Sequence, residues 1–180
     1  MRLERSECIG VIVDVQERVI PHVDGREGLE AALARLVRGL GALEVPLVLV
    51  QHNTRGLGET VAPIRALMEG RPRFEKLTFS AWGEAPFREH LQAAGRTTAI
   101  VAGTESHVCV LQTVLDLLAA GWRTVVVEDA VSSRRPLDRR VALERMRQEG
   151  SRVSTVESLL YELTERSGTG LFREILAIVK

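Results

Sequence analysis

One cysteine of this 180-residue chain follows a predicted buried strand and opens a predicted helix. Residues 98–102 form an apolar run typical of such a strand, Gly103 is expected to break it, and Ser106 is expected to cap the following helix. Cys109 then lies in the first helical turn, where free amides and the helix dipole favour a thiolate. This position suits a nucleophile, although Cys109 could instead be a small buried apolar residue.

A carboxylate stands at the end of the first apolar run. Residues 8–15 read C-I-G-V-I-V-D-V, which is typical of a strand buried on both faces of a parallel sheet. Asp14 is costly in such a run unless it has a partner, so it is a candidate site residue. Capping of the next turn is the alternative role for Asp14. Gln16 adds a second polar group at the same strand end.

Strands alternate with helices along the chain, which predicts an α/β fold with a mostly parallel sheet. Further strands are expected at residues 47–50, 74–76, 124–127 and 152–155, and further helices at residues 26–43, 86–94, 136–150, 156–165 and 171–179. Ligands of such sheets bind beyond the carboxyl ends of strands, where the strand order reverses. A reversal between their two strands would therefore place Asp14 and Cys109 across one crevice.

The segment between Gly58 and Pro86 has weak periodicity. A long irregular segment inside a compact domain usually covers a site. Phe79 and Trp82 lie in it and are candidates for the wall of a substrate pocket, with core packing as the alternative for either one.

Composition narrows the class of function. Twenty-four basic residues balance twenty-four acidic ones, so no overall field favours nucleic acid or an anionic membrane, and a small-molecule substrate is expected. No stretch approaches the roughly 20 apolar residues of a membrane span, and the first residues are unlike a secretory signal, so we expect a cytoplasmic protein. Residues 1–180 are expected to form one domain. Cys8 and Cys109 should lie at opposite ends of the sheet and should not pair.

Three separated motifs stand in this order along the chain: Asp14-Val15-Gln16, Lys76, and the run Gly103-Thr104-Glu105-Ser106-His107-Val108-Cys109-Val110. Together they resemble the isochorismatase-like cysteine hydrolases, a family that includes nicotinamidases and carbamoyl-group amidohydrolases. Further motifs are still more similar to the uncharacterised isochorismatase-domain hydrolases of that family: Gly56-Leu57-Gly58, Phe74-Glu75-Lys76, the run C-V-L-Q-T at residues 109–113, and residues 129–134.

The resemblance implies an open six-stranded sheet in the order 3-2-1-4-5-6, with helices on both faces. It also implies a catalytic triad of Asp14, Lys76 and Cys109, and a cis peptide bond between Thr104 and Glu105 beside backbone oxyanion donors. Burial should raise the pKa of Asp14, whereas Lys76 and the helix start should lower that of Cys109, which would ease proton transfer. The implied reaction hydrolyses a small amide, carbamoyl or related carbonyl compound through a thioester on Cys109.

The chain departs from the metal-dependent nicotinamidases, which carry an Asp-x-His element after the second strand. This chain has Gln51-His52-Asn53 there, and His52 alone is not a metal site, so we expect no metal and no cofactor. We expect His52 to be a surface or otherwise satisfied histidine. His107 could line the substrate pocket or serve only at the start of the helix.

Two other functions stay open from the sequence. One is a thiol-based redox-sensing or binding protein on the same fold without turnover, and the other is an assembly subunit with a vestigial site. Asp14 together with Lys76 favours the hydrolase, because a redox sensor needs a low-pKa thiol but no general base. A homo-oligomer is expected, since Leu171, Phe172 and the other apolar residues of the last helix need cover and family members usually form closed oligomers.

Overall fold

The computed structural model describes residues 2–180, and in that part of the chain six strands form one sheet. Every neighbouring pair is parallel, and the order β3-β2-β1-β4-β5-β6 confirms the predicted topology. The strands are β1 (Cys8–Val13), β2 (Leu47–His52), β3 (Arg73–Lys76), β4 (Thr98–Thr104), β5 (Arg123–Ser132) and β6 (Arg152–Ser154).

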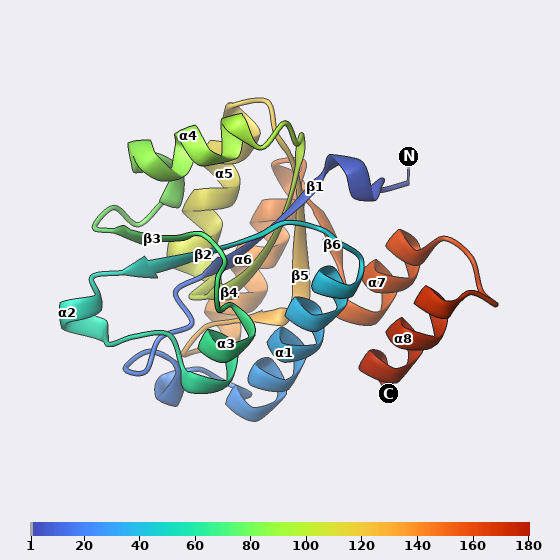
Figure 1. Cartoon of the computed structure of the whole chain (residues 1–180). Helices are drawn as coiled ribbons and strands as arrows, with labels where there is room; N and C mark the ends of the chain where they lie inside the picture. Colours follow the sequence, from blue (N-terminus) through green and yellow to red (C-terminus); the bar gives the residue numbers. More distant parts are fainter. Residues whose placement is uncertain (1) are drawn as a thin grey trace.

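Helices cover both faces of the sheet (Figure 1). One face carries α1 (Arg26–Ala42), α3 (Ala62–Leu67), α7 (Val156–Thr164) and α8 (Gly170–Val179). The other carries α4 (Ala85–Ala93), α5 (Leu111–Ala119) and α6 (Pro136–Gln148). Short helical segments complete the chain: α2 (Thr54–Leu57), the 3-10 turns η1 (Arg5–Glu7), η2 (Ile20–His22) and η3 (Ala81–Gly83), and the π-helical turn η4 (Ser106–Val110).

The central strands β1 and β4 are buried along their whole length, because helices on both faces exclude water from them. Two apolar cores result, one on each face of the sheet. Among residues 2–180, none of the helices combines the length and apolarity that crossing a membrane requires.

Gly103 does not break the strand that precedes Cys109, contrary to the sequence prediction. β4 continues through Gly103 to Thr104, and Gly103 adopts a φ of 122°. A Cβ atom at this position would lie 1.9 Å from the carbonyl oxygen of Val13, so glycine permits the close approach of β4 to β1. β5 is also longer than predicted, and its register against β4 shifts between Val101 and Gly103.

The segment between Gly58 and Pro86 is more regular than its sequence indicated. It contains α3, β3 and η3, of which α3 has six residues and β3 has four. Elements this short hold too few residues for a periodic pattern to stand out. The edge strand predicted at residues 74–76 is present as β3.

The apolar last helix is covered largely by its own chain. α8 packs against α1 and α7, and it buries Ile175 completely. Leu171, Ile178 and Val179 are partly buried against the same core. This packing weakens the argument that α8 requires a second subunit.

Candidate active site

Three polar residues stand at the carboxyl ends of three neighbouring strands. Asp14 follows β1, while His52 and Lys76 end β2 and β3 and are paired in register. Asp14 has a φ of 49°, which ends the strand at Val13 rather than at the predicted residue 15. The Oγ1 of Thr104 donates to the carbonyl oxygen of Asp14 over 2.6 Å, which fixes this turn against the end of β4.

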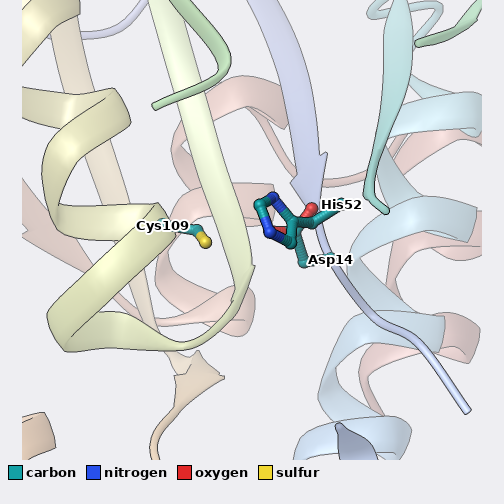
Figure 2. Close-up of side chains that lie close together, drawn as sticks. All are labelled: Asp14, His52 and Cys109. Atoms are coloured by element: carbon teal, nitrogen blue, oxygen red, sulfur yellow. The ribbon is translucent and has the colours of Figure 1, made fainter. Parts of the chain in front are cut away.

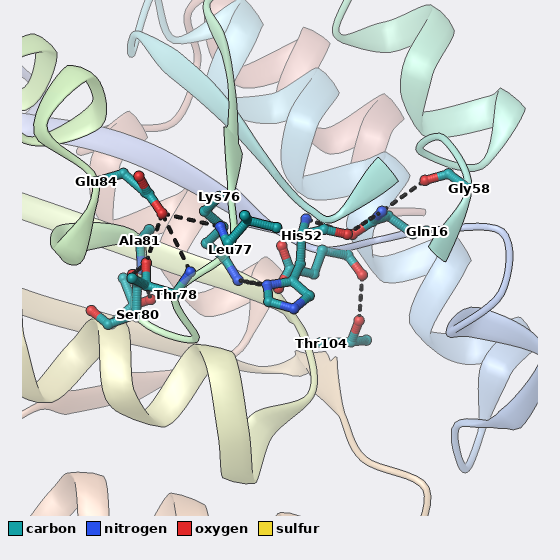
Figure 3. A network of polar contacts seen from close by, with 12 residues as sticks. Gln16, His52, Gly58, Lys76, Leu77, Thr78, Ser80, Ala81, Glu84 and Thr104 are labelled. Carbon is teal, nitrogen blue, oxygen red and sulfur yellow. Dashed lines mark hydrogen bonds and ion pairs between the residues drawn. The ribbon is translucent and has the colours of Figure 1, made fainter. Parts of the chain in front are cut away.

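A buried ion pair forms the floor of the site. The Nζ of Lys76 donates to Oδ2 of Asp14 over 2.7 Å, and the two side chains are 0% and 4% exposed. The same Nζ lies 3.3 Å from Nδ1 of His52, as Figure 3 shows. The other oxygen of Asp14, Oδ1, is buried and has no hydrogen-bond partner among the described residues. Burying two charges carries a large desolvation cost, so this pair is a stronger indication of function than of stability.

Cys109 reaches the same place from the turn η4, directly after β4. Ser106 does not cap this turn as predicted, because the helix starts after Glu105 and the buried Ser106 hydroxyl has no partner in the described chain. The peptide bond between Thr104 and Glu105 is cis. The Sγ of Cys109 and one donor atom each of Asp14 and His52 lie within 4.8 Å of one another (Figure 2).

Burial dominates the protonation of the site. It raises the pKa of Asp14 above its ordinary value, and the Lys76 ammonium offsets only part of this effect. Burial, followed by the charge of Asp14, raises the pKa of the Cys109 thiol to about 12, although Lys76 acts in the opposite direction. The expected lowering of the thiol pKa is therefore wrong, since desolvation outweighs the nearby cation. The resting site presents a neutral thiol beside a carboxyl group that is more basic than a solvated aspartate.

A cavity of about 230 Å³ opens onto these groups. Its wall consists of Asp14, Val19, His52, Asn53, Leu57, Phe79, Thr104, Glu105, Val108 and Cys109. Phe79 lines the cavity and stacks on the His52 ring at a centroid distance of 5.7 Å. The Glu105 carboxylate accepts from the backbone N and Nε of Arg134, each over 3.0 Å. A larger hollow of about 740 Å³ lies between Arg5 and Arg96, away from this chemistry.

Three residues considered for the pocket lie elsewhere. The Gln16 side chain is buried and is tied to the backbone of His52 and Gly58 by bonds of 2.7 to 3.0 Å. Trp82 packs edge-on against Trp122. His107 turns its Nδ1 to Ser133 Oγ over 2.9 Å, in a separate hollow. The partners of these three side chains come from distant segments of the chain, so the local sequence pattern could not predict them.

His52 is partly buried, and its ring contacts Lys76 and Phe79, which agrees with the expected satisfied histidine, but the sequence analysis missed that it lines the site. It is the last residue of β2, and β2 lies beside β1 in the sheet. The strand-end argument that paired Asp14 with Cys109 also applies to His52 once this neighbour relation is known. Val19, Leu57 and Val108 were missed as well, because nothing in an apolar residue type distinguishes a cavity wall from a core.

Comparisons with known proteins agree with this architecture. A model of the isochorismatase domain matches residues 8–158. The Mus musculus isochorismatase domain-containing protein 2A is 35% identical over 183 residues, which cover 99% of this chain and 85% of the relative. The solved structure of MAR1 ribonuclease from Caenorhabditis elegans matches with a TM-score of 0.93 at 30% identity, over 99% of this chain and 92% of that one. The octameric YcaC hydrolase of unknown specificity from Escherichia coli has a TM-score of 0.86 at 24% identity, over 99% and 87%.

Proposed function

Because this chain belongs to the isochorismatase family and has its hydrolase fold, we propose that it is a metal-independent cysteine hydrolase of a small amide, carbamoyl or related carbonyl compound. One observation carries the proposal: Cys109 lies beside the buried Asp14–Lys76 pair and faces a cavity. The cavity, at about 230 Å³, is of a size for a small molecule. A thiol, a base and a cation in contact are the parts that acyl transfer requires.

In the proposed acylation step, Asp14 accepts the thiol proton while Sγ of Cys109 attacks the carbonyl carbon. Burial favours this transfer from the side of the base, because it makes the carboxylate more basic. The Lys76 ammonium stabilises the negative charge on whichever of the two groups carries it. Protonated Asp14 then donates to the leaving nitrogen, the bond from carbon to nitrogen breaks, and a thioester remains on Cys109.

Hydrolysis of the thioester completes the proposed cycle. Asp14 takes a proton from water, the hydroxyl oxygen attacks the acyl carbon, and the bond from carbon to sulfur breaks. Protonated Asp14 then gives its proton to the departing sulfur, which restores the thiol and the carboxylate and releases the acid. We assign the developing oxyanion to backbone amides at Thr104, Glu105 and Cys109, as the family resemblance implies.

Redox sensing ranks second. A thiol with a pKa of about 12 holds very little thiolate at neutral pH, and the thiolate is the form that peroxide oxidises. A general base that removes the proton only during attack fits hydrolysis better than it fits sensing.

A screen of small amides, carbamoyl compounds and carboxylic esters tests the proposal, with Cys109→Ala as the blank. Turnover is expected with at least one class, together with an acyl adduct on Cys109 that is visible in intact mass. RNA belongs in the screen because the similar C. elegans structure is that of a ribonuclease. Fast peroxide oxidation without acylation, or RNA cleavage that survives Cys109→Ala, would contradict the proposed function.

We further propose that residues 1–180 act as one domain in the cytoplasm and assemble into a homo-oligomer. Free Cys8 and Cys109 suit a reducing compartment. Leu77 and Phe79 are 74% and 52% exposed near the mouth of the site, and the similar E. coli YcaC protein is octameric. Light scattering should show a particle larger than the 19.9 kDa chain, and a stable monomer at micromolar concentration would contradict the assembly.

A further inference from the structure

We propose that the cavity beside Cys109 selects uncharged amide and carbamoyl compounds and rejects carboxylate analogues of the same shape. This selection rests on the proposed hydrolase function and narrows its substrate class. It follows from the charged and hydrogen-bonding groups of the cavity wall, which match an amide and oppose an anion. Amides and carboxylic acids are both small carbonyl compounds, and the fold alone does not distinguish between them.

The cavity wall contains two carboxylate side chains, those of Asp14 and Glu105. A cation is already paired with each of them. Lys76 contacts Oδ2 of Asp14 over 2.7 Å, and the Oδ1 of Asp14 has no hydrogen-bond partner in the described chain. Both bonds that Arg134 donates go to Oε1 of Glu105, so Oε2 remains an acceptor for another partner. One oxygen of each carboxylate is therefore left for N–H groups of a bound molecule.

His52 supplies the opposite kind of group. Its Nδ1 lies 3.3 Å from Nζ of Lys76, and an ammonium only donates hydrogen bonds, so Nδ1 accepts and the ring proton is on Nε2. The ring stacks on Phe79 with an interplanar angle of 18°, which helps to hold it in the cavity wall. The donor that this ring offers to a bound molecule is therefore a neutral N–H.

An amide matches this set of groups, and a carboxylate does not. The carbonyl oxygen of an amide accepts hydrogen bonds, and its N–H groups can donate to Asp14 and Glu105. A carboxylate only accepts, and it would meet these two residues as a like charge. It would also lose part of its hydration, because Leu57 and Val108 form apolar parts of the wall. Repulsion of the wrong ligand is a common source of specificity.

Alkylation of Cys109 by two reagents of nearly equal shape measures this selection without turnover. Iodoacetamide is an amide, and iodoacetate is its carboxylate analogue. Peptide mass spectrometry at about pH 9 gives the ratio of their rates at Cys109, which is divided by the same ratio for 2-mercaptoethanol, an uncharged thiol in solution. We expect this normalised ratio to be about 10 or more, because the two carboxylates of the wall oppose the anion at short range.

Two substitutions in the wall should weaken the selection. Glu105→Gln removes one like charge and leaves the Arg134 guanidinium without its partner, whereas Phe79→Arg adds a cation at a side chain that is 52% exposed. Each should lower the normalised ratio by about tenfold. Phe79→Gln adds no charge, and Glu7→Gln breaks the similar pair with Arg123 at the other edge of the sheet. These matched controls should keep the wild-type ratio, and circular dichroism shows whether each variant is folded.

Hydrolysis of succinamide and of succinamate, in which a carboxylate replaces one amide, gives the second measurement, and kcat/KM should be about tenfold or more higher for succinamide. A normalised ratio near 1, no labelling of Cys109 by either reagent, or a ratio that neither wall substitution changes would overturn the charge selection. Selective labelling by a protein that hydrolyses no amide would keep the selection and refute the hydrolase. A hydrolase that prefers succinamate would do the reverse.

Discussion

The two cysteines lie at opposite ends of the neighbouring central strands, Cys8 at the edge of the sheet where the strands begin and Cys109 at the edge where they end. They nevertheless have much in common. Both are free and buried, and burial is the largest cause of the raised pKa of each thiol, to about 11 for Cys8 and about 12 for Cys109. Cys8 opens β1 and is 0% exposed, whereas Cys109 lines a cavity beside Asp14. The thiol pKa therefore does not distinguish a candidate nucleophile from a core residue. The adjacent base and the cavity make the distinction.

The ion pairs near the two cysteines differ in their burial. Near Cys8, Nη2 of Arg123 lies 2.6 Å from Oε2 of Glu7, and the two side chains are 35% and 39% exposed. Water screens such a pair, so it contributes little to stability. The Asp14–Lys76 pair has nearly the same distance but is buried. An ion pair that costs desolvation and lies beside a cavity is better explained by chemistry than by folding.

The largest contrast is expected between the two cysteines themselves. Cys109→Ala should reduce turnover by about 1,000-fold or more, because the attacking atom is gone. Cys8→Ala should leave kcat and KM unchanged and should cost about 1 kcal/mol of unfolding free energy. Steady-state kinetics and denaturant unfolding of both variants check this prediction. Equal losses of turnover in the two variants would contradict the assignment of Cys109, and not Cys8, as the nucleophile.

The carboxylates give the next contrast. Asp14→Asn should lower kcat by about 100 to 10,000-fold, the range for loss of a general base, with little change in secondary structure. Glu7→Gln at the other edge is the matched control and should leave kcat unchanged. Steady-state kinetics of both variants and the wild type give the kcat values to be compared, and circular dichroism checks the secondary structure of each variant. Unchanged turnover in Asp14→Asn would refute Asp14 as the base.

Removal of Lys76 and removal of Arg123 should differ in their effects on stability as well as on activity. Lys76→Ala should lose turnover and about 3 to 5 kcal/mol of unfolding free energy, because it leaves a buried carboxyl group without its partner. Arg123→Ala should cost about 1 kcal/mol or less. Urea unfolding of both variants measures these losses.

The pH dependence of the Lys76→Ala loss follows from the sign of the Asp14 shift. A carboxyl group whose pKa is raised on folding stabilises the protein below its unfolded pKa, and this contribution disappears as pH rises through the folded pKa. Without Lys76 that pKa should rise further. The loss in Lys76→Ala should therefore be largest at neutral pH and smaller near pH 4, and a loss that grows on acidification would contradict the burial of Asp14.

The smallest effect concerns the resting thiols. Alkylation of the native protein by iodoacetamide should be slow at both cysteines at pH 7 and should rise about tenfold per pH unit up to pH 10, because both pKa values lie above that range. Peptide mass spectrometry resolves the rates at Cys8 and Cys109. A plateau for Cys109 below pH 8 would indicate a low-pKa thiolate and would favour the redox-sensing function.

Local patterns determined the elements of this protein. The apolar runs around residues 8–15 and 98–102 are the central strands, since a strand covered on both faces must be apolar throughout. Amphipathic spacing placed α1 and α6 to within two residues at each end. The motifs around Asp14, Lys76 and Cys109 indicated the family, and with it the strand order.

Tertiary contacts decided the rest. Lys76 meets Asp14 across 62 residues of sequence, and His52 joins them because β2 lies between β1 and β3. Gln16 turns to the backbone of β2 instead of the cavity, and Gly103 is glycine because β1 passes close by. The pKa of Cys109 rises because packing removes water from it. Residues near in sequence impose periodicity, whereas neighbours, burial and electrostatics depend on segments that meet only in the folded chain.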